Sequence, residues 1–193
     1  MTEEHQKHLE HYQMLLEDFS PGLVLNHRVK NPLGDASAHA EDGFDDIRIT
    51  FNILFKEKAY HIKFISYSET IIITEADLGF SFSLAIKQIP KYVRGLYKRN
   101  LLYAGNQFHR MHVHASQPLN IEVLKPELVK LCALSPCVQI QNIRDHANSQ
   151  ALAAKPKKES LVLDLKSLPK NKEEMLEILT AFDFISNHTT TLS

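Results

Sequence analysis

The stretch IRITFNILFKEKAYHIKFISYSETIIITEADLGFSFSLAI, residues 47–86, decides the fold of this 193-residue chain. Apart from Leu54, its first nine residues alternate between apolar and polar side chains, which is the period of a strand with one buried face. Two further alternating runs and the apolar run Ile71–Ile73 follow, each after a short turn. Four strands joined by such short connections predict an antiparallel meander.

Helical and strand patterns succeed one another outside this stretch. Apolar residues at helical spacing predict helices over residues 3–19, 90–102 and 126–134, and from residue 171 to near the C terminus. Shorter apolar runs predict strands over residues 108–116, 138–140 and 161–165. We therefore expect an α+β fold, in which a mostly antiparallel sheet of five or more strands is flanked by three or four helices. We expect one domain over residues 1–193, with sub-halves 1–104 and 105–193 as the alternative.

Local signals mark several of the element boundaries. Pro90 suits the first turn of a helix, because a proline there loses no hydrogen bond. Asn171 and Glu174 have the spacing of a capping pair at the start of the last helix. Two polar segments, residues 31–46 and 145–158, are predicted to be loops, the second of them mobile.

Composition restricts the classes of protein to which the chain can belong. It is 44% hydrophobic and 23% charged, and it has no apolar run long enough to span a membrane. Its first residues lack the pattern of a secretory signal, and its two cysteines are too few for a disulfide framework. We therefore expect a soluble, cytoplasmic protein with free thiols at Cys132 and Cys137, which does not bind membranes.

Net charge also bears on the partner. The formal charge is −1 at pH 7, which gives no overall attraction to nucleic acid or to anionic membranes. Nucleic acid is therefore not the expected partner unless a local patch binds it.

The stretch from Gly105 to Ser135 resembles a layout found in bacterial proteins of unknown function. In those proteins a strand begins Gly-x-x-Phe-Asp and ends near a Ser-Asp-Pro turn, and a Thr-Pro-Glu-Leu helix follows. The matching residues here are Gly105, Phe108, Ser116, Pro118, Pro126, Glu127 and Leu128. His109 and Gln117 stand where aspartates are usual, and Lys125 stands where threonine is usual. The resemblance implies a strand, a proline-containing turn and a helix, and it implies no activity.

Three histidines in the strand predicted over residues 108–116 form one candidate site. His112 and His114 should lie on the same side of that strand, about 7 Å apart, with His109 close by. Imidazole is a common ligand of transition metals, but a site needs a third and usually a fourth ligand. The alternative is that these histidines, with Arg110, form the polar face of a half-buried strand whose apolar face is Met111, Val113 and Ala115.

A basic helical face forms a second candidate site. On the helix predicted over residues 90–102, Lys91, Arg94 and Lys98 share one stripe, with Arg99 beside it. Tyrosines alternate with these cations, so the face between Lys91 and Arg99 could bind phosphates or stack bases. The alternative is the ordinary solvated face of an amphipathic helix.

The sequence contains none of the familiar catalytic signatures. It has no GxSxG, GxxxxGK, GxGxxG or HExxH motif. The leading hypothesis is therefore a non-catalytic binding or interaction domain, with an unidentified protein partner or small ligand and no cofactor. The alternatives are a metal binder or metal-dependent enzyme that uses His112 and His114, and a nucleic-acid or phosphate binder that uses the face from Lys91 to Arg99. Whether the protein is an enzyme stays open at this point, as does its oligomeric state.

Overall fold

A computed structural model describes residues 3–19, 24–29, 47–65, 68–76, 78–96, 101–144 and 159–190. Both polar segments predicted to be loops, residues 31–46 and 145–158, lie outside these described residues. The elements in chain order are α1 (Glu3–Leu16), η1 (Glu17–Phe19), β1 (Val24–Val29), β2 (Ile47–Phe55), β3 (Lys58–Ile65), β4 (Glu69–Glu75), β5 (Phe82–Ile89), η2 (Lys91–Leu96), β6 (Leu101–Ala104), β7 (Gln107–Ala115), α2 (Ile121–Leu134), β8 (Cys137–Arg144), β9 (Glu159–Leu165) and α3 (Lys172–Thr190).

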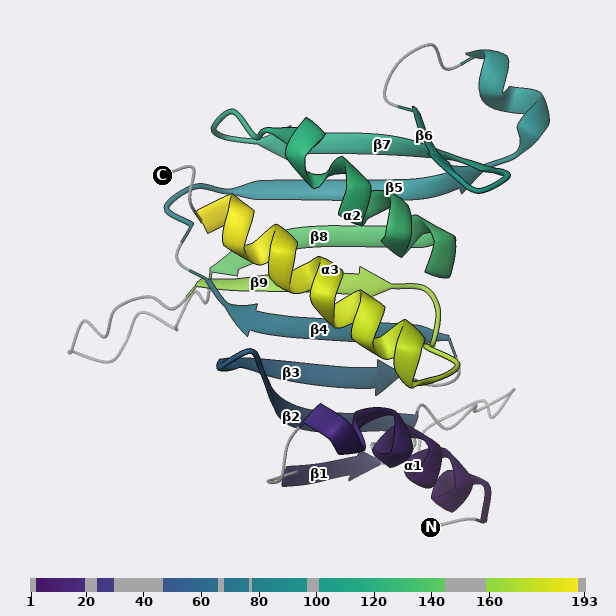
Figure 1. Cartoon of the computed structure of the whole chain (residues 1–193), viewed down its shortest axis with the longest axis vertical. Helices are drawn as coiled ribbons and strands as arrows, with labels where there is room; N and C mark the ends of the chain where they lie inside the picture. Colours follow the sequence, from purple (N-terminus) through teal and green to yellow (C-terminus); the bar gives the residue numbers. More distant parts are fainter. Residues whose placement is uncertain are drawn as a thin grey trace, which may run out of the picture.

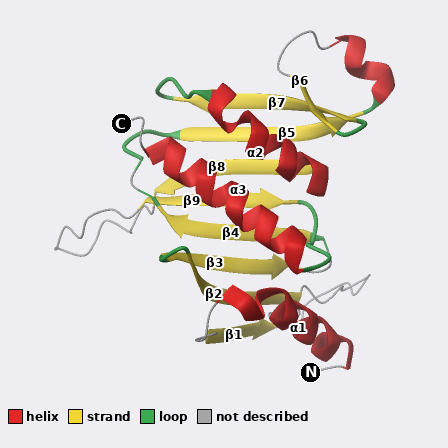
Figure 2. Cartoon of the chain, in the orientation of Figure 1, coloured by secondary structure: helices red, strands yellow, loops and turns green. Residues whose placement is uncertain are grey.

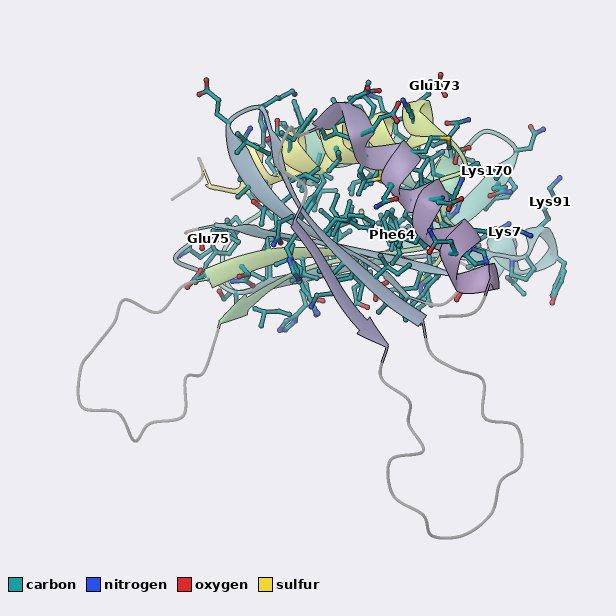
Figure 3. All side chains as sticks on the ribbon, turned by 90° about the horizontal axis from the view of Figure 1, so that it is seen from below. Lys7, Phe64, Glu75, Lys91, Lys170 and Glu173 are labelled. Atoms are coloured by element: carbon teal, nitrogen blue, oxygen red, sulfur yellow. The ribbon has the colours of Figure 1, made fainter. Side chains whose placement is uncertain are left out.

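The fold is α+β, as the sequence predicts. The described strands form one nine-stranded sheet in the order β1-β2-β3-β4-β9-β8-β5-β7-β6. Every pairing between neighbouring strands is antiparallel. The three described α-helices lie on the same face of this sheet, with α3 crossing its middle (Figure 1). Figure 2 shows the same arrangement by element type, and Figure 3, turned by 90°, shows that the opposite face of the sheet carries no described α-helix.

The predicted four-strand meander is wrong at its last step. β2, β3 and β4 are consecutive neighbours, but β9 and β8 lie between β4 and β5. β9 takes this central place because Leu161, Leu163 and Leu165 are buried on one face, and Val162 is 7% exposed on the other. A strand in the middle of a sheet has neighbouring strands on both sides, which shields such apolar residues from water. Strands from before and after residue 104 are thus interleaved in one sheet.

The core lies between the sheet and the helices. Tyr12 of α1 stacks on Phe64 of β3 with ring centroids 4.3 Å apart, and Phe51 of β2 meets Phe64 edge-on at 5.9 Å. Figure 3 shows Phe64 between the helix layer and the sheet. These three side chains are buried, so they fix how α1 docks on β2 and β3. α3 packs against both α1 and α2.

Two tight hairpin turns set the register at opposite ends of the sheet. Lys56 and Glu57 join β2 to β3 with φ angles of 48° and 65°. Two successive positive φ values define a type I′ turn, whose twist matches that of the flanking strands. Gly105 begins the turn between β6 and β7 with φ of 58°, which glycine adopts without a steric cost.

Two helix predictions need correction. In place of the α-helix predicted over residues 90–102, the described residues form a short 3₁₀-helix, η2 (Lys91–Leu96), and the start of strand β6 (Leu101–Ala104). Leu102 and Ala104 are buried when β6 pairs with β7, and this tertiary gain outweighs a helical pattern already weakened by Gly95. The helix predicted to begin at Pro126 begins at Ile121, with Pro126 in its second turn.

The predicted cap of the last helix is confirmed. The backbone N–H of Glu174 donates to Asn171 Oδ1 at 2.9 Å. The Glu174 carboxylate accepts from the backbone N–H of Lys170 at 2.8 Å. α3 extends to Thr190, and Thr189 near its end is buried.

Candidate functional site

The helix-free face of the sheet at its β8-β5-β7-β6 end is the main candidate site. Side chains alternate between the two faces of each strand, so cross-strand partners identify those on the helix-free face. On these four strands they are Leu101, Tyr103, Phe108, Arg110, His112, His114, Ser83, Ala85, Lys87, Ile89, Cys137, Gln139, Gln141 and Ile143. None of the four strands contains an Asp or a Glu. We call this surface the basic sheet face.

Two cations lie side by side on the basic sheet face. Lys87 of β5 is the direct cross-strand partner of Arg110 of β7. Like charges in directly opposed positions destabilise a sheet, and none of these four strands contains an Asp or a Glu. Such a pair creates a positive potential that an anionic ligand would neutralise.

An exposed aromatic residue stands next to these cations. Tyr103 of the edge strand β6 is 59% exposed, although it is a large aromatic side chain. Its cross-strand partner is Phe108, and the two rings meet edge-on with centroids 4.9 Å apart. Arg110 is two residues beyond Phe108 on β7. Tyr103, the partner of Phe108, is therefore a diagonal neighbour of Arg110 on the same face. This arrangement places a rigid ring and two cations on one surface.

The structure separates the three candidate metal-binding histidines. His112 and His114 are exposed on the basic sheet face, whereas His109 is fully buried on the helix-covered face with Met111. The directly opposed residues on β5 are Ala85 for His112 and Ser83 for His114, and neither is a strong metal ligand. Within the described part of the chain, no group of three or more His, Cys, Asp or Glu side chains is placed to hold a metal ion. Metal binding by His112 and His114 stays a prediction.

The predicted basic helical face is only partly described. Lys91 is exposed in η2, near the end of the molecule in Figure 3. The side chain of Arg94 is not described, and Lys98 and Arg99 lie outside the described residues. η2 contacts β7 and begins two residues after Ile89, which is the cross-strand partner of Phe108. Lys91 therefore lies toward the Tyr103 end of the basic sheet face.

Sequence reasoning identified His112, His114 and Arg110 as one polar face, and the structure confirms this. It did not find that Lys87 and Tyr103 share that face, because strand pairing between distant segments decides it. A charge signal was nevertheless present in the sequence. Residues 79–121 contain six of the 22 Lys and Arg residues and none of the 23 Asp and Glu residues. The net charge of −1 thus conceals a basic segment in an otherwise acidic chain.

A buried polar cluster joins α3 to the β2–β3 hairpin. Asp183 of α3 is 6% exposed and accepts hydrogen bonds from the Tyr60 hydroxyl at 2.9 Å and from Lys56 Nζ at 3.3 Å. Burial, followed by the hydrogen bond to Asp183, raises the pKa of the Tyr60 hydroxyl well above its usual value. Lys58 Nζ donates to the Ser186 hydroxyl at 2.5 Å.

A serine beside a lysine is one arrangement used in nucleophilic catalysis. Burial lowers the pKa of Lys58, and the nearby Asp183 carboxylate raises it in partial compensation. However, Ser186 has no exposed surface, so a substrate could not reach its hydroxyl without unpacking α3. We therefore interpret Lys58 and Ser186 as a structural contact.

A groove of about 590 Å³ lies between η1, the end of β2 and the start of α3. Its apolar wall includes Leu54 and Leu176, which are 55% and 47% exposed. Its two lysines already have carboxylate partners: Lys56 pairs with Asp183, and Lys172 pairs with Glu17 and Asp18. The groove is large enough for a small ligand, but it offers no cation that lacks a partner.

A cluster of one lysine and two carboxylates lies near the middle of the helix-free face. Lys166 donates to Glu69 and to Asp164, the latter at 3.2 Å. Burial raises the pKa of the Asp164 carboxyl, although the hydrogen bond from Lys166 lowers it in part. These carboxylates mark the boundary of the basic sheet face, because β9 is the first strand beyond β8.

His109 leads to a stability prediction. Its two ring nitrogens are buried and have no hydrogen-bond partner among the described residues. An unsatisfied buried polar group costs about 1–3 kcal/mol, so His109→Leu should raise the free energy of unfolding by about that amount. Burial also lowers the pKa of His109 in the folded state. The unfolded chain therefore binds more protons below about pH 6.5, and the wild type loses stability as the pH falls from there through the folded-state pKa.

Urea unfolding at pH 8 and pH 5 measures both effects. His109→Leu should be the more stable protein at both values and should lose less stability on acidification. His112→Leu, on the exposed face of the same strand, is the control and should show no comparable gain. A His109→Leu protein less stable than the wild type at pH 5 would show that this imidazole is satisfied in the folded state.

Comparisons with known proteins add a distant structural similarity. No protein-family model and no curated protein matches the chain. A crystal structure of the mycobacterial trehalose monomycolate transport factor A, TtfA, is similar over 92% of this chain and 92% of that chain, with a TM-score of 0.45 and 10% sequence identity. At that level the similarity carries no conclusion about function.

Among the described helices, none combines the length and the apolar character needed to cross a membrane. Cys132 and Cys137 are both free thiols, as expected, and burial raises the pKa of Cys132 to about 12.

Proposed function

We propose that this protein is a non-catalytic binding domain that takes an anionic partner on the basic sheet face. The observation that supports the proposal is a pair of neighbouring cations on a sheet surface that no described α-helix covers. Six cations and no carboxylate occur between residues 79 and 121, and the structure places Lys87 and Arg110 from this segment side by side.

The alternatives have less support from the described residues. Catalysis by Lys58 and Ser186 would need access to a hydroxyl that has no exposed surface. A metal site at His112 and His114 needs a third ligand, and His109 lies on the other side of the sheet. Binding of an anion on the basic sheet face requires only cations that are already at or near the surface.

Inorganic polyphosphate is a suitable first probe, because it carries phosphate charge without bases or acyl chains. Isothermal titration at 50 and 200 mM salt should show binding that weakens steeply as salt rises, since neutralised phosphates release counterions. Lys87→Gln should weaken binding at 50 mM salt several-fold. Lys63→Gln, on β3 at the other end of the same sheet face, is the matched control and should bind as the wild type does. Absence of binding at 50 mM salt, or equal losses in both variants, would contradict the proposal.

A further inference from the structure

We infer that the anionic partner is a single-stranded nucleic acid, with Tyr103 as a stacking surface for a base and with Lys87 and Arg110 beside its phosphates. This inference rests on the proposed function above and adds the chemistry of the ligand. It uses two observations that lie on the same surface, an exposed ring and two neighbouring cations on strands that contain no Asp or Glu.

The exposed Tyr103 ring favours nucleic acid over polyanions that have no bases. Tyr103 is 59% exposed on an edge strand, and the edge-on contact with Phe108 holds its ring in place. Every base has a π-face, so one fixed aromatic ring binds single strands without requiring a particular sequence. A polyphosphate chain has no base that could stack on the ring, so the ring adds nothing to its affinity.

The positions of the cations fit a strand that crosses the sheet. Arg110 and Lys87 form one row of cross-strand partners, and Tyr103 and Phe108 form the next row along the strands. Successive rows are separated by two residues, or about 7 Å. A base stacked on Tyr103 therefore leaves its flanking phosphates within reach of the two long basic side chains. Lys91 and Tyr92 of η2 lie toward the same end, and Tyr92 is 87% exposed.

Single-stranded ligands fit this face better than a duplex does. Stacking on Tyr103 needs an unpaired base, whereas a duplex presents its bases only at groove edges. A major groove admits an α-helix or a two-stranded ribbon, and the described α-helices all lie on the other side of the sheet (Figure 3). Duplex DNA of the same length should therefore bind more weakly than a single strand.

Fluorescence anisotropy with labelled ten-nucleotide oligouridine and oligothymidine tests the inference on the full chain. Tyr103→Leu keeps an apolar side chain on the edge strand but removes the π-face, and it should weaken oligonucleotide binding at least fivefold. Tyr103→Phe keeps the ring and should bind within about twofold of the wild type. Polyphosphate binding should be the same in all three proteins. Stronger binding of either oligonucleotide than of a matched duplex would support the inference. The affinities for oligouridine and oligothymidine, compared with each other, show whether RNA or DNA is preferred.

The outcomes separate this inference from the proposed function. Polyphosphate binding with no effect of Tyr103→Leu on oligonucleotides would overturn the nucleic-acid inference and leave the proposed function in place. Absence of binding to every polyanion would overturn both. Binding to vesicles of anionic phospholipid that Tyr103→Leu abolishes, without oligonucleotide binding, would overturn the inference in favour of a membrane surface. Circular dichroism checks that each variant is folded. Tyr103→Phe is the matched control for Tyr103→Leu, because it changes the same position but keeps the aromatic ring.

Discussion

Asp183→Ala should lower the free energy of unfolding by about 3–5 kcal/mol, because it removes the acceptor at the centre of a buried polar cluster. Asp183 accepts hydrogen bonds from Tyr60, Lys56 and Asn187, and its carboxylate also faces the partly buried Lys58. Without it, the buried Tyr60 hydroxyl loses its partner and Lys58 loses a favourable charge. α3 would then be held to the β2–β3 hairpin by apolar contacts and by the contact between Lys58 and Ser186.

A series of substitutions divides this loss into parts. Asp183→Asn keeps an oxygen that can accept from Tyr60 and should cost less than Asp183→Ala. Tyr60→Phe removes one hydrogen bond to a charged group and should cost about 1.5–3 kcal/mol. Glu173→Ala, at an exposed position of the same helix, is the control and should change stability by less than about 0.5 kcal/mol. Urea unfolding at pH 7 gives all four values, and a loss below 1 kcal/mol for Asp183→Ala would contradict this account.

Phe64→Ala should lower the free energy of unfolding by about 3–5 kcal/mol, as truncation of a buried phenylalanine leaves a cavity. Phe64 is fully buried, stacks on Tyr12 of α1 and meets Phe51 of β2. Removal of its ring takes away the contact that positions α1 on the sheet. We therefore expect α1 to become less protected against hydrogen exchange than α3 in this variant.

The neighbouring residue on β3 supplies the control. Lys63 faces the other side of the sheet and is partly exposed, so Lys63→Ala should cost much less than Phe64→Ala. Phe64→Leu, which fills more of the space than alanine does, should fall between the wild type and Phe64→Ala. Equal protection of α1 in the wild type and in Phe64→Ala would show that α1 docks through other contacts.

Tests of the basic sheet face do not depend on these stability effects. Lys87, Tyr103 and the control Lys63 lie on the helix-free face, whereas Phe64 and Asp183 belong to the packed side of the sheet. A binding defect in Lys87→Gln or Tyr103→Leu can therefore be measured in a protein whose core is intact.

The sequence by itself determined the elements whose signals are local. Alternation of period two in residues 47–65 predicted β2 and β3, and side-chain spacing on the last helix predicted the Asn171 and Glu174 cap. The same period placed Met111 on one side of β7 and His112 and His114 on the other. Each of these depends only on residues near one another in the chain, so no tertiary information was needed.

Tertiary structure alone decided which segments meet. Nothing local to Leu161–Leu165 shows that this strand lies between β4 and β8, since its place depends on pairing with two strands from other parts of the chain. The helix predicted over residues 90–102 reaches into β6, yet residues 101–104 form a strand because pairing with β7 buries Leu102 and Ala104. The basic sheet face has the same origin: Lys87, Tyr103 and Arg110 are distant in sequence, and long-range hydrogen bonding between β5, β7 and β6 brings them together on one surface.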